Sequence, residues 1–408
     1  MEFRQQTLDN GLEIVAECNP QAYSAALAFF VKTGSRDETD ALSGVSHFLE
    51  HMVFKGTERR SAEDVNRELD EICAGSNAFT SEEQTVYHAT FLPERQADVV
   101  ALLSDIMRPA LRASDFEMEK QVILEEIAMY EDQPPFRAHE KCMTAHFGEH
   151  PLANSVLGSV ESVSALSAAQ MEAYFQQRYS PQNIALVATG NVDFEQLVQQ
   201  ADSHCGRWQA FATERATPRA AQASSRVHMQ KDTSFQHYMI QICNGPAAAD
   251  EDRYAARALA TIFGDDGGSR LFWEFVDTGL AEYAWMHCYE FQGTGIIMTD
   301  ICSSPEQAEG NLQRLADLQT VLAQQGITEE ELQRAKNKIT SQVVLQSERP
   351  AHRLMSVGSG WVQRQAYRSV REVLEAYQTL TCDDVNAVLS RYPLSPNTTF
   401  TIGPNASA

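Results

Sequence analysis

The stretch "LSAAQMEAYFQQRYSPQNIALVATGN", residues 166–191, has a counterpart near the end of the chain, "LTCDDVNAVLSRYPLSPNTTFTIGP", residues 380–404. In both, a Ser or Thr after Leu starts a helical segment that ends at Arg-Tyr and a proline turn, and an apolar strand then runs to glycine. The pairs Arg178-Tyr179 and Arg391-Tyr392 are 213 residues apart (391 − 178), close to half of the 408-residue chain. A repeat of this size predicts two similar domains of about 200 residues each.

Strand patterns alternate with helix patterns on both sides of these repeats. "LEIVAE" and "SAALAFFVKTGS" are predicted to be neighbouring strands, "SEEQTVYHATFLP" is predicted to be another strand, and residues 115–131 a helix. In the second half, "FQHYMIQICNGP" is predicted to be a strand and residues 328–346 a helix. The order predicts an α+β fold: two similar domains, each a mainly antiparallel sheet with helices packed on one face. The boundary is expected within residues 210–227, which gives domains at 1–215 and 216–408.

The acidic composition narrows the range of partners. The chain has 56 Asp and Glu against 32 Lys and Arg, a formal charge of -24. Nucleic acids and anionic membranes select basic patches, so neither is expected as a partner. No apolar run approaches the roughly 20 residues of a membrane span. The start, "MEFRQQTLDNGLEIVAE", lacks the apolar segment of a secretory signal, so a cytoplasmic protein is expected.

A polar cluster interrupts an amphipathic helix pattern in "GVSHFLEHMVFKGT", residues 44–57. His47 and His51 are at positions i and i+4, so their imidazoles can converge on one point, and Glu50 points near the same spot. Two neutral imidazoles suit a zinc ion, and a nearby carboxylate suits a water activated by that ion. The alternative is a solvated helix face without a ligand. The apolar stripe of this helix consists of Val45, Phe48, Leu49, Met52 and Val53.

A catalytic zinc takes three protein ligands, and the best third candidate lies in "EMEKQVILEEIAMYEDQ", residues 117–133. Glu119 and Glu126 fall on a mostly apolar helical stripe, whereas Glu125 lies about 100° away and should face outward. A buried carboxylate must find a cation, a donor or water, which favours Glu126 over Glu125 as a ligand. Periodicity alone favours the plainer alternative, in which Glu119 and Glu126 line an exposed margin and pair with lysines.

The context of the H-x-x-E-H motif, "SGVSHFLEHMVFKGT", resembles the pitrilysin/insulinase family of zinc endopeptidases, which includes the mitochondrial processing peptidase. That family's third ligand is a Glu about 75 residues beyond the second His, in a V-x-x-E-E helix. Glu126 lies 75 residues beyond His51 (126 − 51), within "VILEEI". "LDNGLEIV", "HPLANSVLGS" and "GGSRLFWEFVDTGLA" also resemble family segments, so the likeness runs the length of the chain and implies a repeated α+β domain.

The resemblance implies a metalloendopeptidase that cleaves peptides or small unfolded proteins. His47, His51 and Glu126 would hold Zn²⁺, Glu50 would act as general base, and Glu119 would support a ligand and shape the site. "GSNAFTSEEQTVYHAT" resembles the family's edge segment, so Asn77, Ala78 and Phe79 are expected to bind an extended peptide by β-augmentation. A plain turn entering a strand is the alternative for these three residues.

One segment departs from the family pattern. Active members carry an Arg and a Tyr in a second-half domain; here Tyr283 could match the Tyr, but Val276 stands where the Arg is expected. In some two-chain members a homologous partner supplies that pair. The chain is therefore expected to be the zinc-bearing subunit of a homodimer or heterodimer that encloses the peptide. Two alternatives stay open: an inactive or scaffold-type member that binds peptides or a partner without hydrolysis, and a metal-dependent hydrolase of non-peptide amides on an unrelated fold.

Overall fold

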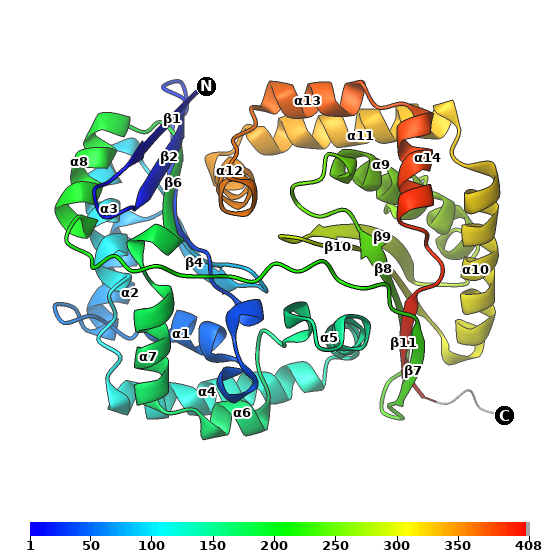
Figure 1. Ribbon diagram of the computed structural model, residues 1–408, viewed down its shortest axis with the longest axis horizontal. Helices are drawn as coiled ribbons and strands as arrows, with labels where there is room; N and C mark the ends of the chain where they lie inside the picture. Colours follow the sequence, from blue (N-terminus) through cyan, green and yellow to red (C-terminus); the bar gives the residue numbers. More distant parts are fainter. Residues whose placement is uncertain (405–408) are drawn as a thin grey trace. The chain divides into compact units, whose positions relative to one another are not determined.

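The computed structural model describes residues 1–404, which form two compact units, each drawn from separate parts of the chain (Figure 1). The first unit consists of Met1–Ala128, Asn154–Ala216 and Leu345–Arg368. The second unit consists of Met129–Ala153, Thr217–Val344 and, of the described residues, 369–404.

The first unit is built on a six-stranded sheet in the order β1-β2-β6-β3-β5-β4. All its neighbours are antiparallel except β2 and β6, which are parallel. The prediction that "LEIVAE" and "SAALAFFVKTGS" are neighbouring strands is wrong, because β6 lies between β2 and β3. Every residue of β6 is buried, so this apolar strand takes an interior position in the sheet. The strands are β1 (Glu2–Thr7), β2 (Glu13–Cys18), β3 (Ala25–Val31), β4 (Gly75–Thr80), β5 (Thr85–Phe91) and β6 (Ile184–Gly190).

Helices cover both faces of this sheet, which corrects the prediction of helices on one face. In Figure 1, α12 (orange) lies on the side of β2 and β6 opposite α3 and α8. Every residue of β3 is buried, so both of its faces need an apolar cover. Gly358 lets α12 approach β3 closely, because a Cβ there would lie 2.1 Å from the Phe30 ring. The helices are α1 (Val45–Val53), α2 (Ala62–Ile72), α3 (Gln96–Ile106), most of α4 (Ala113–Glu131), α6 (Val160–Ala165), α7 (Ala168–Arg178), α8 (Phe194–Cys205) and α12 (Pro350–Arg364).

The second unit repeats this plan with a five-stranded sheet in the order β7-β11-β8-β10-β9. One face packs against α9 and its neighbours, and the other packs against α5, where Ala138 and Cys142 join Ile242, Met298 and Phe400 in one apolar cluster. The strands are β7 (Ser225–Gln230), β8 (His237–Gly245), β9 (Tyr283–Glu290), β10 (Gly295–Ser303) and β11 (Thr398–Gly403). The helices are α5 (Pro134–Phe147), α9 (Asp252–Gly264), α10 (Ala308–Gln325), most of α11 (Glu329–Ser347), α13 (Val370–Gln378) and α14 (Cys382–Arg391).

The internal repeat is confirmed in three dimensions. In each copy, a helix (α7 or α14) precedes a strand (β6 or β11) that lies between one parallel and one antiparallel neighbour. The predicted fold class is therefore confirmed: an α+β chain with two similar, mainly antiparallel sheets. In each unit, the helix on the second face of the sheet comes from the opposite half of the sequence, α12 in the first unit and α5 in the second.

Asp300 is a partly buried carboxyl in the middle of β10, and its sheet neighbours on the same face are Ile240 and Trp285. No cation pairs with it among residues 1–404. Burial raises the pKa of Asp300 to about 7, so folding favours its protonated form.

The Asp300 contribution to stability should therefore be complete below its unfolded pKa, near 4, and be lost as the pH rises through about 7. We expect Asp300→Asn to melt at a higher temperature than the wild type at pH 8, and the difference to shrink by pH 4. Thermal unfolding across this range checks the prediction, with the exposed Asp277→Asn as a control for removal of a negative charge. A difference that stayed constant with pH would contradict it.

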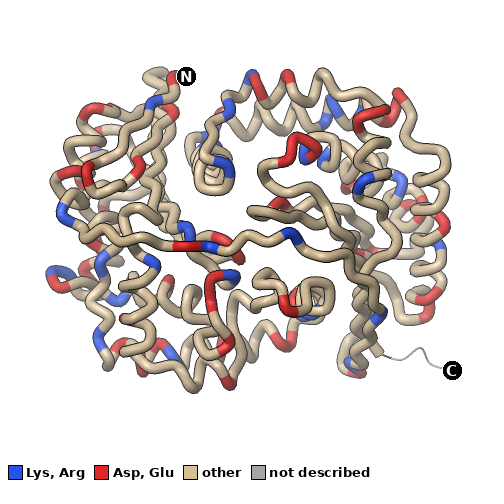
Figure 2. The backbone as a smooth tube through the Cα atoms, viewed as in Figure 1, with Lys and Arg blue, Asp and Glu red and all other residues tan. Residues whose placement is uncertain are grey.

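Within the described residues, no helix combines the length and the apolar character that crossing a lipid bilayer requires. Acidic and basic residues are interspersed along the backbone of each unit and do not gather on one element (Figure 2). The eight cysteines are free thiols.

Candidate metal centre

The helix α1 carries the H-x-x-E-H motif on a tightly packed element. Its stripe residues Val45, Phe48 and Leu49 are fully buried. Phe48 stacks on Phe116 of α4 with ring centroids 4.6 Å apart, so the two helices that hold the candidate ligands pack directly on each other. The periodicity prediction for α1 and α4 is confirmed.

His47, His51 and Glu126 converge on one point, as the helical spacing of the two histidines and the family resemblance of Glu126 predicted. Each offers one ligand atom, and these atoms lie within 4.8 Å of one another. Glu126 Oε2 lies 3.7 Å from His47 Nε2 and 3.6 Å from His51 Nε2. Ligand atoms bound to a tetrahedral zinc at about 2.0–2.1 Å are separated by about 3.4 Å. The two Glu126 separations are close to this value, and the widest separation, at most 4.8 Å, exceeds it by up to about 1.4 Å, so the three side chains can share one zinc ion once the imidazoles move closer together. Glu125 is exposed, as predicted.

The two imidazoles differ in their electrostatic surroundings. Burial, with a smaller effect from His51, lowers the pKa of His47 to about 3, so His47 is neutral and its ring can act as a ligand. Burial also opposes charge on His51, but the hydrogen bond to Glu119 and the charges of Glu126, Glu119 and Glu50 outweigh it and raise the pKa of His51. The same negative surroundings would favour a metal cation at this point.

Glu119 supports His51 from the side away from Glu126. The carboxylate is 4% exposed, and its Oε1 lies 2.9 Å from His51 Nδ1. An Nδ1–H that donates to Glu119 leaves Nε2 free to bind a metal, the arrangement common for histidine ligands. Lys55 pairs with the other Glu119 oxygen. Against the cost of burial, the hydrogen bonds to His51 and Lys55 lower the pKa of Glu119 and keep it charged.

We expect Glu119→Gln to weaken zinc binding by roughly 10–100-fold, the usual effect of removing an outer partner of a ligand. The amide that replaces the carboxylate no longer compensates the Lys55 charge and holds the His51 ring less firmly. Competition with a chromophoric chelator measures the affinity. Glu117→Gln, at a largely exposed position of the same helix, is the matched control. Wild-type zinc affinity in Glu119→Gln would show that the contact is only structural.

Glu50 lies beside these groups and is held by a strand of the sheet. Its Oε2 accepts a 2.6 Å hydrogen bond from the hydroxyl of Thr80, the last residue of β4. Burial raises the pKa of Glu50, and the Thr80 hydrogen bond opposes that rise. The charges of His51 and Glu126 also act on this pKa, so the three groups share one electrostatic environment. A carboxyl with a raised pKa next to a metal site is suited to accepting and returning a proton.

Asn77, Ala78 and Phe79 lie on β4, the edge strand next to β5. Asn77 is exposed, and Phe79 is 36% exposed. The structure thus places these residues at a sheet edge with Thr80 linking the strand to Glu50, while a role in binding peptides stays a prediction.

Tyr283 and Val276 belong to the second unit. Tyr283 begins β9 and stacks on Trp285 with ring centroids 4.4 Å apart. Burial raises the pKa of the Tyr283 hydroxyl. Val276 ends the short helical segment η6 (Phe272–Val276) and packs against the second unit's core.

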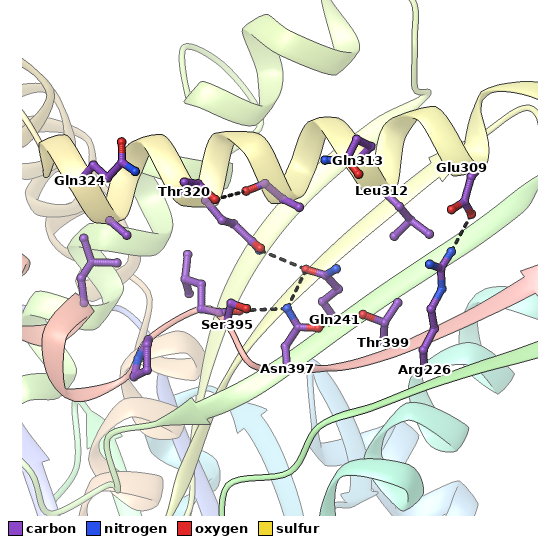
Figure 3. Close-up of a pocket in the computed structure, with 16 residues that line it drawn as sticks. Arg226, Gln241, Glu309, Leu312, Gln313, Thr320, Gln324, Ser395, Asn397 and Thr399 are labelled. Carbon is purple, nitrogen blue, oxygen red and sulfur yellow. Dashed lines mark hydrogen bonds and ion pairs between the residues drawn. The ribbon is translucent and has the colours of Figure 1, made fainter.

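A cavity of about 540 Å³ lies in the second unit between α10 and the strands β8 and β11 (Figure 3). Its polar centre consists of amides that already bond to one another: Gln319 Nε2 and Asn397 Nδ2 both donate to Gln241 Oε1. The acidic side chain in its lining, Glu309, is paired with Arg226 at 2.6 Å. This chemistry does not suit a divalent metal, so His47, His51 and Glu126 remain the candidate centre.

Sequence reasoning missed the supporting contacts of Lys55 and Thr80. Lys55 lies in the turn that follows α1, and its partner Glu119 is 64 residues away (119 − 55), so helical periodicity does not connect them. Thr80 lies in the edge segment, and no spacing in the sequence connects it to Glu50.

Two protein-family models match successive parts of this chain, and several known proteins are similar to it over nearly its whole length. The family described as "Insulinase (Peptidase family M16)" matches residues 13–160, and "Peptidase M16 inactive domain" matches residues 165–339. An uncharacterized zinc protease of Mycobacterium tuberculosis is 33% identical over 399 residues, which cover 96% of this chain and 91% of that protein. One from Streptomyces coelicolor is 33% identical over 394 residues, covering 94% and 86%. The crystal structure of a protease from Helicobacter pylori has a TM-score of 0.92 and 21% identity over 99% of both chains, a likeness of fold alone.

Proposed function

Since the chain belongs to peptidase family M16, the insulinase family, we propose that it is a zinc metalloendopeptidase that cleaves peptides or small unfolded proteins. His47, His51 and Glu126 would hold the zinc, and Glu50 would be the general base. The observation that carries the proposal is the convergence of three ligand atoms from α1 and α4. The names of the Mycobacterium and Streptomyces relatives support the choice of metal.

Zinc bound by these side chains would supply a Lewis acid and lower the pKa of a coordinated water toward about 7. Glu50 Oε takes one proton from the attacking water as the water oxygen bonds to the scissile carbonyl carbon. Glu50 then delivers that proton to the amide nitrogen as the C–N bond breaks, which yields a carboxyl and an amine. Thr80 holds the Glu50 carboxyl in place through its 2.6 Å hydrogen bond. Glu119 and Lys55 keep the His51 ring oriented.

The edge strand β4 is the proposed place where substrate binds. An extended peptide would pair with the free edge of Gly75–Thr80 and so run past Glu50. Backbone pairing accepts many side chains, so broad cleavage specificity is expected. Asn77, Ala78 and Phe79 would line the peptide.

A residue in the second half of the chain, Val276, suggests that the chain acts with a partner. Val276 stands where active relatives are expected to carry an Arg, so we propose that a homologous chain, in a homodimer or heterodimer, supplies the Arg and Tyr that bind the substrate carbonyl. A member that binds peptides or a partner without hydrolysis is the second candidate. The match of residues 165–339 to a domain described as inactive favours it for the second half.

One experiment separates the two candidates. The purified chain is loaded with zinc and given an internally quenched peptide, alone and together with any homologous chain that copurifies from its own cells. Cleavage that requires zinc, in either arm, supports the peptidase. Zinc binding with no cleavage in both arms supports the non-hydrolytic candidate, and failure to bind zinc overturns the proposal.

A further inference from the structure

The carboxyl group of a residue outside α1 caps the amino end of that helix. Glu38 follows the 3-10 helix η1 (Ser35–Asp37) and is 8% exposed. Its Oε2 accepts a 2.7 Å hydrogen bond from Gly44 N, and its Oε1 accepts one of 2.7 Å from Ser46 N. Both oxygens of one side chain therefore hold the first turn of the helix that carries His47.

Glu38 supplies the side-chain acceptor that the N-cap residue of α1 lacks. The first N–H groups of a helix lack intrahelical partners, and usually the side chain of the N-cap residue accepts from them. The N-cap of α1 is Gly44, with φ of 91°. A side chain there would be strained, and its Cβ would lie 2.6 Å from Leu157 O. Glycine is required at this position, so the acceptor must come from elsewhere.

The surroundings fix Glu38 and the first turn together. Asn154 Nδ2 donates to the Glu38 carbonyl at 3.2 Å, and the hydroxyls of Ser46 and Tyr174 are 2.8 Å apart. Burial raises the pKa of Glu38 to about 8, although the hydrogen bonds from Ser46 and Gly44 oppose that rise. The two hydrogen bonds from the first turn of α1 therefore offset part of the cost of burying this acidic group.

The position of the cap matters because α1 has only nine residues and His47 is the third of them. Short helices fray first at their ends, and an uncapped first turn would move His47 while leaving His51, in the last turn, in place. A metal site needs its ligands held together, so fraying of one turn lowers affinity for the metal.

We propose that Glu38 is a positioning residue for the metal centre, which fixes the first turn of α1 so that His47 meets His51 and Glu126. This inference rests on the proposed function, because it presumes that the three side chains bind zinc. It assigns Glu38 no contact with zinc or substrate.

The test compares Glu38 variants with a buried carboxylate elsewhere in the same unit. Glu17 pairs with Arg353 at 2.7 Å and is 1% exposed, so Glu17→Gln controls for loss of stability alone. Glu38→Gln keeps the size and one acceptor, and Glu38→Ala removes both acceptors. Full-length proteins are assayed for melting temperature, for zinc affinity by chelator competition, and for the visible absorption of bound Co²⁺, which reports coordination geometry.

We expect Glu38→Ala to bind zinc roughly tenfold more weakly, the size of a lost helix cap, with an altered Co²⁺ spectrum. Glu38→Gln should fall between Glu38→Ala and the wild type. Glu17→Gln should melt lower but keep wild-type affinity and spectrum. If both Glu38 variants bind zinc with wild-type affinity and spectrum, the inference is overturned while the proposed function stands. If the wild type itself binds neither metal, the proposed function fails and this inference fails with it. If Glu38→Ala does not fold, Glu38→Gln alone decides.

Discussion

Glu50→Gln is expected to abolish peptide hydrolysis while zinc stays bound. Gln keeps the size of the side chain and still accepts a hydrogen bond from Thr80, but it cannot take a proton from water at neutral pH. A positioned general base contributes about 10²–10⁴-fold to a rate, and here the same group also returns the proton to the leaving nitrogen. The loss should therefore lie at the upper end of that range or beyond it, in kcat rather than KM.

The measurement is the initial rate on a quenched peptide with zinc content determined on the same sample. Thr80→Val is an informative companion, because it keeps the Glu50 carboxyl but removes its 2.6 Å hydrogen bond, and it should lose less activity than Glu50→Gln. Hydrolysis at the wild-type rate by Glu50→Gln would show that another group acts as the base.

Glu126→Ala is expected to weaken zinc binding more than Glu119→Gln does, and to remove hydrolysis as a consequence. Glu126 is the carboxylate of the three-residue cluster, and its Oε2 lies 3.6–3.7 Å from both imidazoles. Losing a direct ligand should cost more than the roughly 10–100-fold of an outer partner. Without this carboxylate, the two imidazoles supply no negative charge to the cation.

Glu125→Ala is the matched control, one residue earlier on the same helix but exposed. It should bind zinc and cleave peptide as the wild type does. Chelator competition and elemental analysis of the purified proteins give the comparison. Equal zinc affinity in the two variants would remove Glu126 from the ligand set and leave the centre without its third ligand.

The features that the sequence predicted correctly are those that depend on one helix or on one continuous segment of the chain. The stripe Val45, Phe48 and Leu49 fixed the face of α1 that packs inward. The same reasoning turned Glu125 outward and put Glu126 on the inner stripe of its helix, whereas the family resemblance made Glu126 the candidate third ligand. Helical periodicity decides such questions because burial repeats every 3.6 residues. The repeat of helix, proline turn and strand predicted the two similar units for the same reason, since each copy is one continuous segment.

What the sequence did not reveal depends on contacts between distant segments. The insertion of β6 between β2 and β3 joins residues more than 150 positions apart, and the apolar pattern of β2 and β3 is the same whichever neighbour each strand has. The sequence did not predict that α12 and α5 cover the second face of the two sheets. The apolar stripe of a helix shows that one side of the helix is buried, but it does not show which sheet the helix packs against. The partners of Lys55 and Glu50 depend on the same long-range geometry.

Each unit takes one helix from the opposite half of the sequence, and this affects how the chain folds during synthesis. As the ribosome releases the chain from its first residue onward, the sheet of the first unit acquires all its strands once Gly190 has emerged, yet one apolar face stays bare until α12 ends at Arg364. During that interval α12 is not yet available to cover Ala28, Phe30 and Val187, so these apolar side chains are exposed to water or to a chaperone. The first unit can therefore be completed only after Arg364 has been synthesised, and a chain that stopped soon after Gly190 would expose this apolar face instead of forming a smaller folded unit.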